Sequence, residues 1–199
     1  MLSFLKKETD QLHKEVEKNS LARFILDQSI TVEKYTHFLL QNYYSYLEIE
    51  QQLIANKQLA PDTLLSFISN EKSDALHKDI AYLSDHDLLN DEEFSFSVSS
   101  TAALIGALYV IEGSMLGGLL ISKRLKNCKH LEEVKEFHFF GKNPEQSLTR
   151  WKTFTKVVEE LSFSEEQQQH GALAAKNAFM CFKKYQNVDY APSTTITSF

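Results

Sequence analysis

Apolar residues recur at helical spacing along nearly the whole chain, and only three prolines interrupt the pattern. The longest run extends from Tyr35 to Ile54, where intervals of three and four place the apolar residues on one helical face. We find neither the alternating pattern of a half-buried strand nor an internal repeat. At 199 residues, the chain is long enough to bury one core. The sequence therefore predicts a single all-α domain of about seven or eight helices.

Capping residues indicate where several of these helices begin. A polar side chain just before a helix can accept a hydrogen bond from the free N–H groups of the first turn. Asn143 is followed by proline at the first helical position, and Ser164 opens a capping box with Gln167. The predicted caps are Thr31, Ser99 or Ser100, Asn143 and Ser164. An earlier helix spans residues 2–16.

The other boundaries follow from helix breakers and composition. Ala60-Pro61 ends the helix that begins after Thr31, and residues 64–83 hold one or two shorter helices. The acidic stretch 85–93 predicts a loop, and the helix after it runs to about Asn127. Residues 1–186 are therefore expected to form the helical domain, and the Ser/Thr-rich residues 187–199 a disordered tail.

Composition excludes several classes of protein. A net charge of −6 argues against general nucleic-acid binding, which relies on clustered Lys and Arg. Cys128 and Cys181 are far apart, which fits a reducing compartment and excludes a thiolate metal cluster within the chain. The N-terminus lacks a signal-peptide pattern, and no uninterrupted apolar segment approaches the ~20 residues that cross a bilayer. We therefore expect a cytoplasmic protein without a membrane span.

Four of the six glycines lie in one apolar helical stretch, residues 104–124. Each glycine inside a helix costs roughly 1 kcal/mol relative to alanine. Glycines are kept in helices where the helix kinks or where another group approaches the backbone closely. The run Gly113–Gly118 has no preceding strand and no following Gly-Lys-Ser/Thr, so a phosphate-binding loop is not expected. Close helix packing and a flat ligand against the backbone are the two remaining explanations.

His13 is a candidate ligand-binding residue. Lys6, Asp10, His13 and Glu17 share one face of the first helix, beside its apolar stripe. Glu17 can orient the imidazole of a metal-binding histidine, and Lys6 can pair with an anionic group. From spacing alone, a surface histidine in a salt-bridged helix face is the simpler explanation.

Two motifs together resemble the haem oxygenase family. Residues 5–17 are similar to the proximal helix of that family, with its pattern L-K-x-x-T-x-x-x-H-x-x-x-E. Residues 108–118 are similar to the distal helix in its bacterial form, Y-V-x-E-G-S-x-L-G-G. Their order, their separation of about 100 residues and the all-helical prediction agree with the family across nearly the whole chain.

The resemblance implies a haem-oxygenase-like bundle, with haem between a proximal N-terminal helix and a glycine-kinked distal helix. His13 would then ligate the iron with support from Glu17, and the Gly113–Gly118 backbone would lie over the distal haem face. Lys6 and Arg150 are expected to meet the haem propionates. The full set that the resemblance assigns to haem binding or catalysis is Lys6, His13, Glu17, Gly113, Ser114, Gly117, Gly118, Arg150 and Phe179.

The implied activity is cleavage of haem with O2 and external electrons to biliverdin, CO and Fe2+. Haem would be both cofactor and substrate. The sequence has no dinucleotide or flavin fingerprint, so a ferredoxin or a flavoprotein reductase would supply the electrons. At Ser114 the chain departs from the animal-type pattern, where an aspartate organises the distal water. That departure leaves the route of proton delivery open.

Two alternatives remain at this point. A haem-binding or haem-storage protein would keep the pocket but not the turnover. A di-iron carboxylate bundle would use carboxylate–histidine pairs on one helical face, with further glutamates from other helices. The candidate ligands for that bundle are Asp10 with His13, Asp74 with His77, and Glu48, Glu50 or Glu112.

Overall fold

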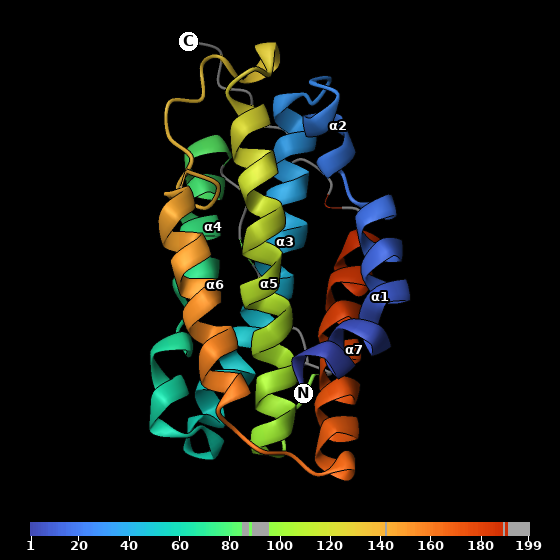
Figure 1. The fold of residues 1–199 in the computed structure, drawn as a ribbon. Coiled ribbons are helices and arrows are strands. Elements are labelled where there is room, and N and C mark those ends of the chain that lie inside the picture. Colours follow the sequence, from blue (N-terminus) through green and yellow to red (C-terminus); the bar gives the residue numbers. More distant parts are fainter. Residues whose placement is uncertain (85–87, 89–95, 142, 189, 191–199) are drawn as a thin grey trace.

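The computed structural model describes residues 1–84, 88, 96–141, 143–188 and 190. Within them the chain forms seven α-helices and three short 3-10 helices, without a β-strand (Figure 1). The all-α prediction is therefore confirmed. The α-helices are α1 (Leu2–Asn19), α2 (Ala22–Leu26), α3 (Val32–Ala55), α4 (Glu71–Leu83), α5 (Thr101–Leu125), α6 (Pro144–Glu159) and α7 (Glu165–Gln186), and the 3-10 helices are η1 (Lys57–Leu59), η2 (Asp62–Phe67) and η3 (Lys129–Leu131).

The predicted helix caps are present in the structure. The side chains of Thr31, Ser100, Asn143 and Ser164 each accept a hydrogen bond from a backbone N–H in the first turn that follows. Ser164 and Gln167 form the complete capping box. These helix starts are fixed by chemistry within a few residues of the chain, which is why sequence reasoning finds them.

The structure differs from the sequence prediction at the short elements. The helix after Thr31 ends at Ala55, and residues 57–59 form η1 ahead of Pro61. Residues 64–83 divide between η2 and α4, and α2 was not predicted. Of the predicted loop 85–93, only Leu88 lies within the described residues. Of the predicted tail, the described Tyr190 stacks on Tyr44 of α3.

Helix α5 is central to the bundle. It lies between α6 and α7 in Figure 1, with α3 behind it. It is one continuous helix, so its glycines do not interrupt it. A methyl group on Gly106 would overlap the backbone of Gly171 in α7 and come within 3.1 Å of the Ala175 nitrogen. Close contact between the α5 and α7 backbones therefore explains this glycine.

Helix α5 is also long and apolar enough to cross a membrane by length and composition alone. Half of its most apolar window is buried inside the protein. The buried charged residue Glu112 lies within it, 2% exposed. Burial against neighbouring helices accounts for the composition of α5.

We predict that Gly106→Ala destabilises the protein by about 1–3 kcal/mol, because the added methyl group meets backbone that no side-chain rotation can move. The matched control is Gly117→Ala, since a methyl group on Gly117 has no protein atom within 4 Å. That control should gain up to ~1 kcal/mol from helix propensity. Urea denaturation of both variants measures the difference, and equal effects would contradict the packing described here.

Candidate functional site

His13 lies on the accessible side of α1. Its side chain is 52% exposed, and its Nε2 is 3.4 Å from Oε1 of Glu17. The centroid of its ring is 5.4 Å from that of Phe179 on α7. With one ring nitrogen facing a carboxylate, the other is left for a ligand. The structure thus brings together three residues that sequence reasoning had selected.

Ion pairs fix α1 against α7 on both sides of His13. The Lys176 ammonium is 2.6 Å from Glu8, and the Lys183 ammonium is 3.0 Å from Glu15. Hydrogen bonds from these lysines hold the pKa of each glutamate below its usual range. Leu5 and Thr9 of α1 are buried in the core beneath. His13 is therefore held in place above Phe179 by its own helix.

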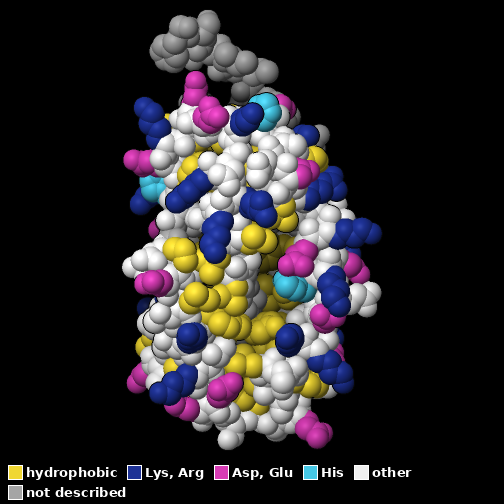
Figure 2. Space-filling view, turned by 45° about the horizontal axis from the view of Figure 1, so that its top comes forward, with side chains coloured by type: hydrophobic (Ala, Val, Ile, Leu, Met, Phe, Trp, Pro, Cys, Tyr) yellow, Lys and Arg dark blue, Asp and Glu magenta, His cyan; other side chains and the backbone are white. Residues whose placement is uncertain are grey.

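A hollow lies on the face of the protein where α1 and α5 diverge (Figures 1 and 2). Helices α1 and α5 are in contact, and Figure 1 shows the C-terminal part of α1 lying away from α5. Figure 2 shows an elongated hollow on this face, with hydrophobic side chains along it and a histidine at its edge. Lysine or arginine side chains lie around its margin. An apolar slot with a cationic rim suits a flat apolar ligand that carries anionic groups.

The glycines of the run Gly113–Gly118 face different surroundings. A methyl group on Gly113 would lie 3.5 Å from the Trp151 ring, and one on Gly118 would lie 3.8 Å from the Phe140 ring. Both distances are ordinary contacts. Gly117 is exposed and would meet nothing within 4 Å, and Leu120 one turn further on is 51% exposed. The part of α5 around Gly117 thus presents bare backbone to open space.

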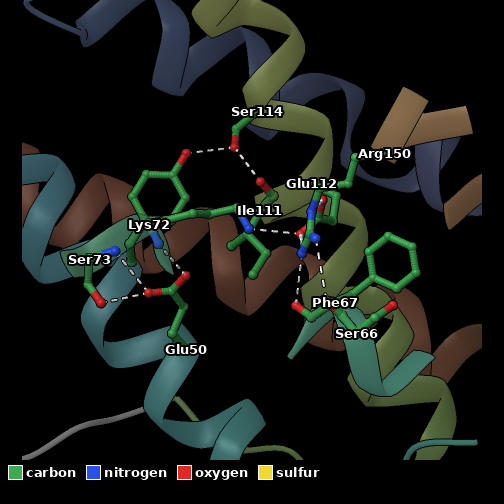
Figure 3. A network of polar contacts seen from close by, with 10 residues as sticks. Glu50, Ser66, Phe67, Lys72, Ser73, Ile111, Glu112, Ser114 and Arg150 are labelled. Atoms are coloured by element: carbon green, nitrogen blue, oxygen red, sulfur yellow. Dashed lines mark hydrogen bonds and ion pairs between the residues drawn. The ribbon is translucent and has the colours of Figure 1, made fainter. Parts of the chain in front are cut away.

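Ser114 is paired with Tyr46, a residue that sequence reasoning had only assigned to the apolar stripe of its helix. The hydroxyl of Ser114 donates to the carbonyl oxygen of Ile111 at 2.9 Å, and it lies 2.7 Å from the Tyr46 hydroxyl (Figure 3). Because the Ser114 proton is already used, Tyr46 is the donor in this pair. Burial raises the pKa of Tyr46, so its phenol keeps its proton at neutral pH. Ser114 retains a lone pair that can accept from water.

An irregular segment supplies an aromatic wall beside this pair. Phe139 packs against Tyr46 with ring centroids 5.3 Å apart, and Phe140 lies next to Gly118. The buried carboxylate of Asp79 on α4 accepts hydrogen bonds from the backbone N–H groups of His138 and Phe139, at 2.6 and 2.9 Å. Sequence reasoning had treated the two phenylalanines as core aromatics. It had no signal for Asp79, since the bonds connect residues 59 and 60 positions apart.

Arg150, which the resemblance assigned to a haem propionate, is paired with a buried carboxylate in the structure. Its Nε is 2.7 Å from one oxygen of Glu112 and its Nη2 is 3.0 Å from the other. Its remaining donors reach the carbonyl oxygens of Ser66 and Phe67, both at 3.4 Å. Four of the five guanidinium N–H groups are thus taken by protein acceptors, and a propionate contact of Arg150 stays a prediction. Lys6 is exposed on α1 and remains a candidate.

The candidate di-iron ligands are not gathered into a site. Glu48 accepts from the Phe96 backbone and the Tyr185 hydroxyl, Glu50 accepts from Ser73, and Glu112 is paired with cations. In the part of the chain that the structure describes, no three His, Cys, Asp or Glu side chains are grouped to hold a metal ion. The geometry therefore does not support a carboxylate-bridged metal pair.

The cysteines are buried and unpaired with each other. Burial raises the pKa of Cys128, and it raises that of Cys181 to about 12. Neither thiol is therefore set up as a nucleophile. His37, the other histidine near a core stripe, has its Nε2 3.1 Å from the Val188 carbonyl oxygen, which satisfies it within the protein.

A family model described as Heme oxygenase matches residues 1–187 of this chain. A comparison with curated protein sequences gives no match. Three solved structures share the fold at low sequence identity, which makes them evidence for architecture alone.

The first is the NO- and CO-bound heme oxygenase of Neisseria meningitidis, with 18% identity and a TM-score of 0.68, over 100% of this chain and 98% of that one. The heme oxygenase of Leptospira interrogans has 19% identity and a TM-score of 0.69, over 93% of this chain and 97% of that one. Heme oxygenase-1 of the cyanobacterium Synechocystis, in complex with heme, has 16% identity and a TM-score of 0.67, over 94% and 90%.

Proposed function

The chain belongs to the haem oxygenase family, and we propose on that basis that it cleaves haem with O2 and external electrons to biliverdin, CO and Fe2+. The observation that carries the proposal is a half-exposed His13 on α1 together with the bare backbone at Gly117 of α5, on a protein whose surface has an apolar hollow with a histidine at its edge (Figure 2). The half-exposed imidazole fits an iron ligand, and the uncovered glycine fits a wall against which a flat ring can lie. We expect the protein to act in the cytoplasm.

On the proximal side, His13 is the proposed iron ligand. Oε1 of Glu17, 3.4 Å from Nε2 of His13, is the proposed acceptor for the second ring nitrogen, and such a bond would fix the tautomer and the ring orientation. Phe179 packs against the imidazole and limits the access of water to it. Lys6 is the proposed partner of a propionate. When bound, haem supplies the iron atom that binds and activates O2 next to its own ring.

On the distal side, the Gly113–Gly118 backbone sets the width of the pocket, and Ser114 and Tyr46 provide its polar groups. Ser114 accepts from Tyr46 and can accept from a water molecule as well. The raised pKa of Tyr46 makes it a neutral donor rather than an acid. These two hydroxyls hold and orient water in the place where animal-type relatives use an aspartate. Electrons come from a separate ferredoxin or flavoprotein reductase.

The second candidate function is haem storage without turnover. It is favoured by the geometry of Ser114, whose own proton is committed to the Ile111 carbonyl oxygen. A protein of this kind would form a stable oxygen complex with haem and release no bilin.

We predict that the haem-loaded wild-type protein, given O2 and a reductase with its electron donor, converts the haem to biliverdin. His13→Ala should remove the iron ligand and, with it, turnover, while added imidazole should restore part of the wild-type spectrum. Absorbance spectroscopy and chromatography of the extracted pigment measure both. An oxygen complex that persists without biliverdin would favour storage, and a wild-type protein that does not bind haem would contradict both functions.

We predict that Tyr46→Phe lowers the turnover rate by about three- to tenfold, which corresponds to the loss of one hydrogen bond of ordinary strength. The ring contacts with Phe139 and Phe182 are retained, so haem affinity and stability should change little. Single-turnover kinetics and haem titration separate the two effects. Phe182→Leu serves as a packing control, because it alters the Tyr46 surroundings without removing the hydroxyl. A Tyr46→Phe rate equal to wild type would show that the phenol takes no part.

A further inference from the structure

Three consecutive residues of α5, Glu112, Gly113 and Ser114, are each held by a different neighbouring side chain. Glu112 is paired with Lys72 of α4 and Arg150 of α6, Gly113 contacts Trp151 of α6, and Ser114 is bonded to Tyr46 of α3. Side chains from α3, α4 and α6 thus contact the same turn of α5 (Figure 3). One turn after Gly113, Gly117 of the same helix faces open space.

The Glu112 carboxylate is the most constrained group of the three. It is 2% exposed, with one oxygen 2.8 Å from the Lys72 ammonium and 3.0 Å from Nη2 of Arg150. Its other oxygen is 2.7 Å from Nε of Arg150. Lys72 is also 2% exposed. The carboxylate therefore has fixed partners on two sides, from helices that flank α5.

Arg150 connects this carboxylate to a second part of the structure. Its guanidinium also donates to the carbonyl oxygens of Ser66 and Phe67 at the end of η2, and it lies 4.9 Å from the centre of the Phe67 ring. Trp151, the next residue in α6, lies against Gly113. Two successive residues of α6 therefore meet two successive residues of α5.

Net stability is a weak reason to bury such a cluster. Removing charged groups from water costs several kcal/mol per ion, and apolar side chains of similar size are often as stabilising. What a fully paired charge cluster supplies is a defined geometry, because a rotation or shift of the helix would leave buried charges without partners. Here the helix so fixed is the one that carries Ser114 and Gly117.

We propose that Glu112, Lys72 and Arg150 are positioning residues that fix the rotation of α5, and thereby the placement of Ser114 and Gly117 in the distal wall. The effect on turnover rests on the proposed haem function. The ion pairs of Glu112 themselves are present in the protein without haem. The proposal gives Arg150 a role besides the propionate contact that the sequence suggested. Arg150 acts on the site through Glu112 and the neighbouring Trp151.

The first test uses the protein without haem. Trp151 is the only tryptophan of the chain, so its fluorescence reports on the contact between α6 and α5. Arg150→Met leaves Glu112 paired with Lys72 and should therefore fold. It should shift Trp151 emission to longer wavelength and increase its quenching by acrylamide. The matched control is Arg23→Met, since Arg23 also lies over an aromatic ring, 4.7 Å from the centre of Phe24, but on α2.

The second test uses the haem-loaded protein with O2 and a reductase. Arg150→Met should lower the turnover of bound haem by roughly 10- to 100-fold, the scale expected for a displaced reacting group. Its haem dissociation constant should equal that of wild type, because His13 is untouched. Arg150→Lys keeps the charge but not the planar set of N–H donors. Its acrylamide quenching and its turnover should both lie between those of wild type and Arg150→Met. Glu112→Gln should also lower the turnover of bound haem, as Arg150→Met does.

The outcomes separate the explanations. Raised quenching and lowered turnover at unchanged haem affinity support the proposal. Weakened haem binding with unchanged quenching overturns it and makes Arg150 a propionate ligand. The proposal is also overturned if Arg150→Met shows the same acrylamide quenching and the same turnover as the control Arg23→Met. If Arg150→Met does not fold, the same measurements of quenching, turnover and haem affinity on Arg150→Lys, which retains the charge, test the proposal. If wild type does not degrade haem, the proposed function fails while the fluorescence still tests the contact.

Discussion

The close backbone contact between α5 and α7 at Gly106 is the constraint on which the rest of the structure depends. It has room for no side chain at Gly106, and it brings two long helices of the core together. Helix α7 in turn carries Phe179 and the lysines that hold α1. The position of His13 relative to α5 is therefore set indirectly, through α7. A looser contact would change the width of the hollow between α1 and α5.

The glycines of α5 serve different purposes along one helix. Gly106 permits packing on α7, Gly113 accepts the Trp151 ring, and Gly117 leaves the backbone bare. Glu112 adds buried charge in the same turn as Gly113, and its two cations come from α4 and α6. Packing therefore dominates the first half of the helix and polar positioning its middle. Beyond that point, an uncovered surface remains for the proposed ligand.

Sequence reasoning succeeded where the determining chemistry is local. The caps at Thr31 and Ser164 were predicted because donor and acceptor lie within three residues of each other. It missed Tyr46 because the Tyr46–Ser114 bond joins residues 68 positions apart, and a tyrosine in an apolar stripe gives no sign of its hydroxyl's partner. The pairing of Arg150 with Glu112 was missed for the same reason, since the two residues are 38 positions apart. Whether His13 binds iron stays a prediction.

The most direct test of the account is the haem affinity of Gly117→Leu, measured by absorbance titration beside the wild type. The leucine side chain would extend into the space where we place the haem ring, and apart from the adjoining backbone of α5 no protein atom lies within 4 Å of the position of its Cβ. We expect the apoprotein of this variant to be at least as stable as wild type and its haem binding to be strongly weakened. Unchanged haem affinity in this variant would contradict the placement of haem between His13 and α5.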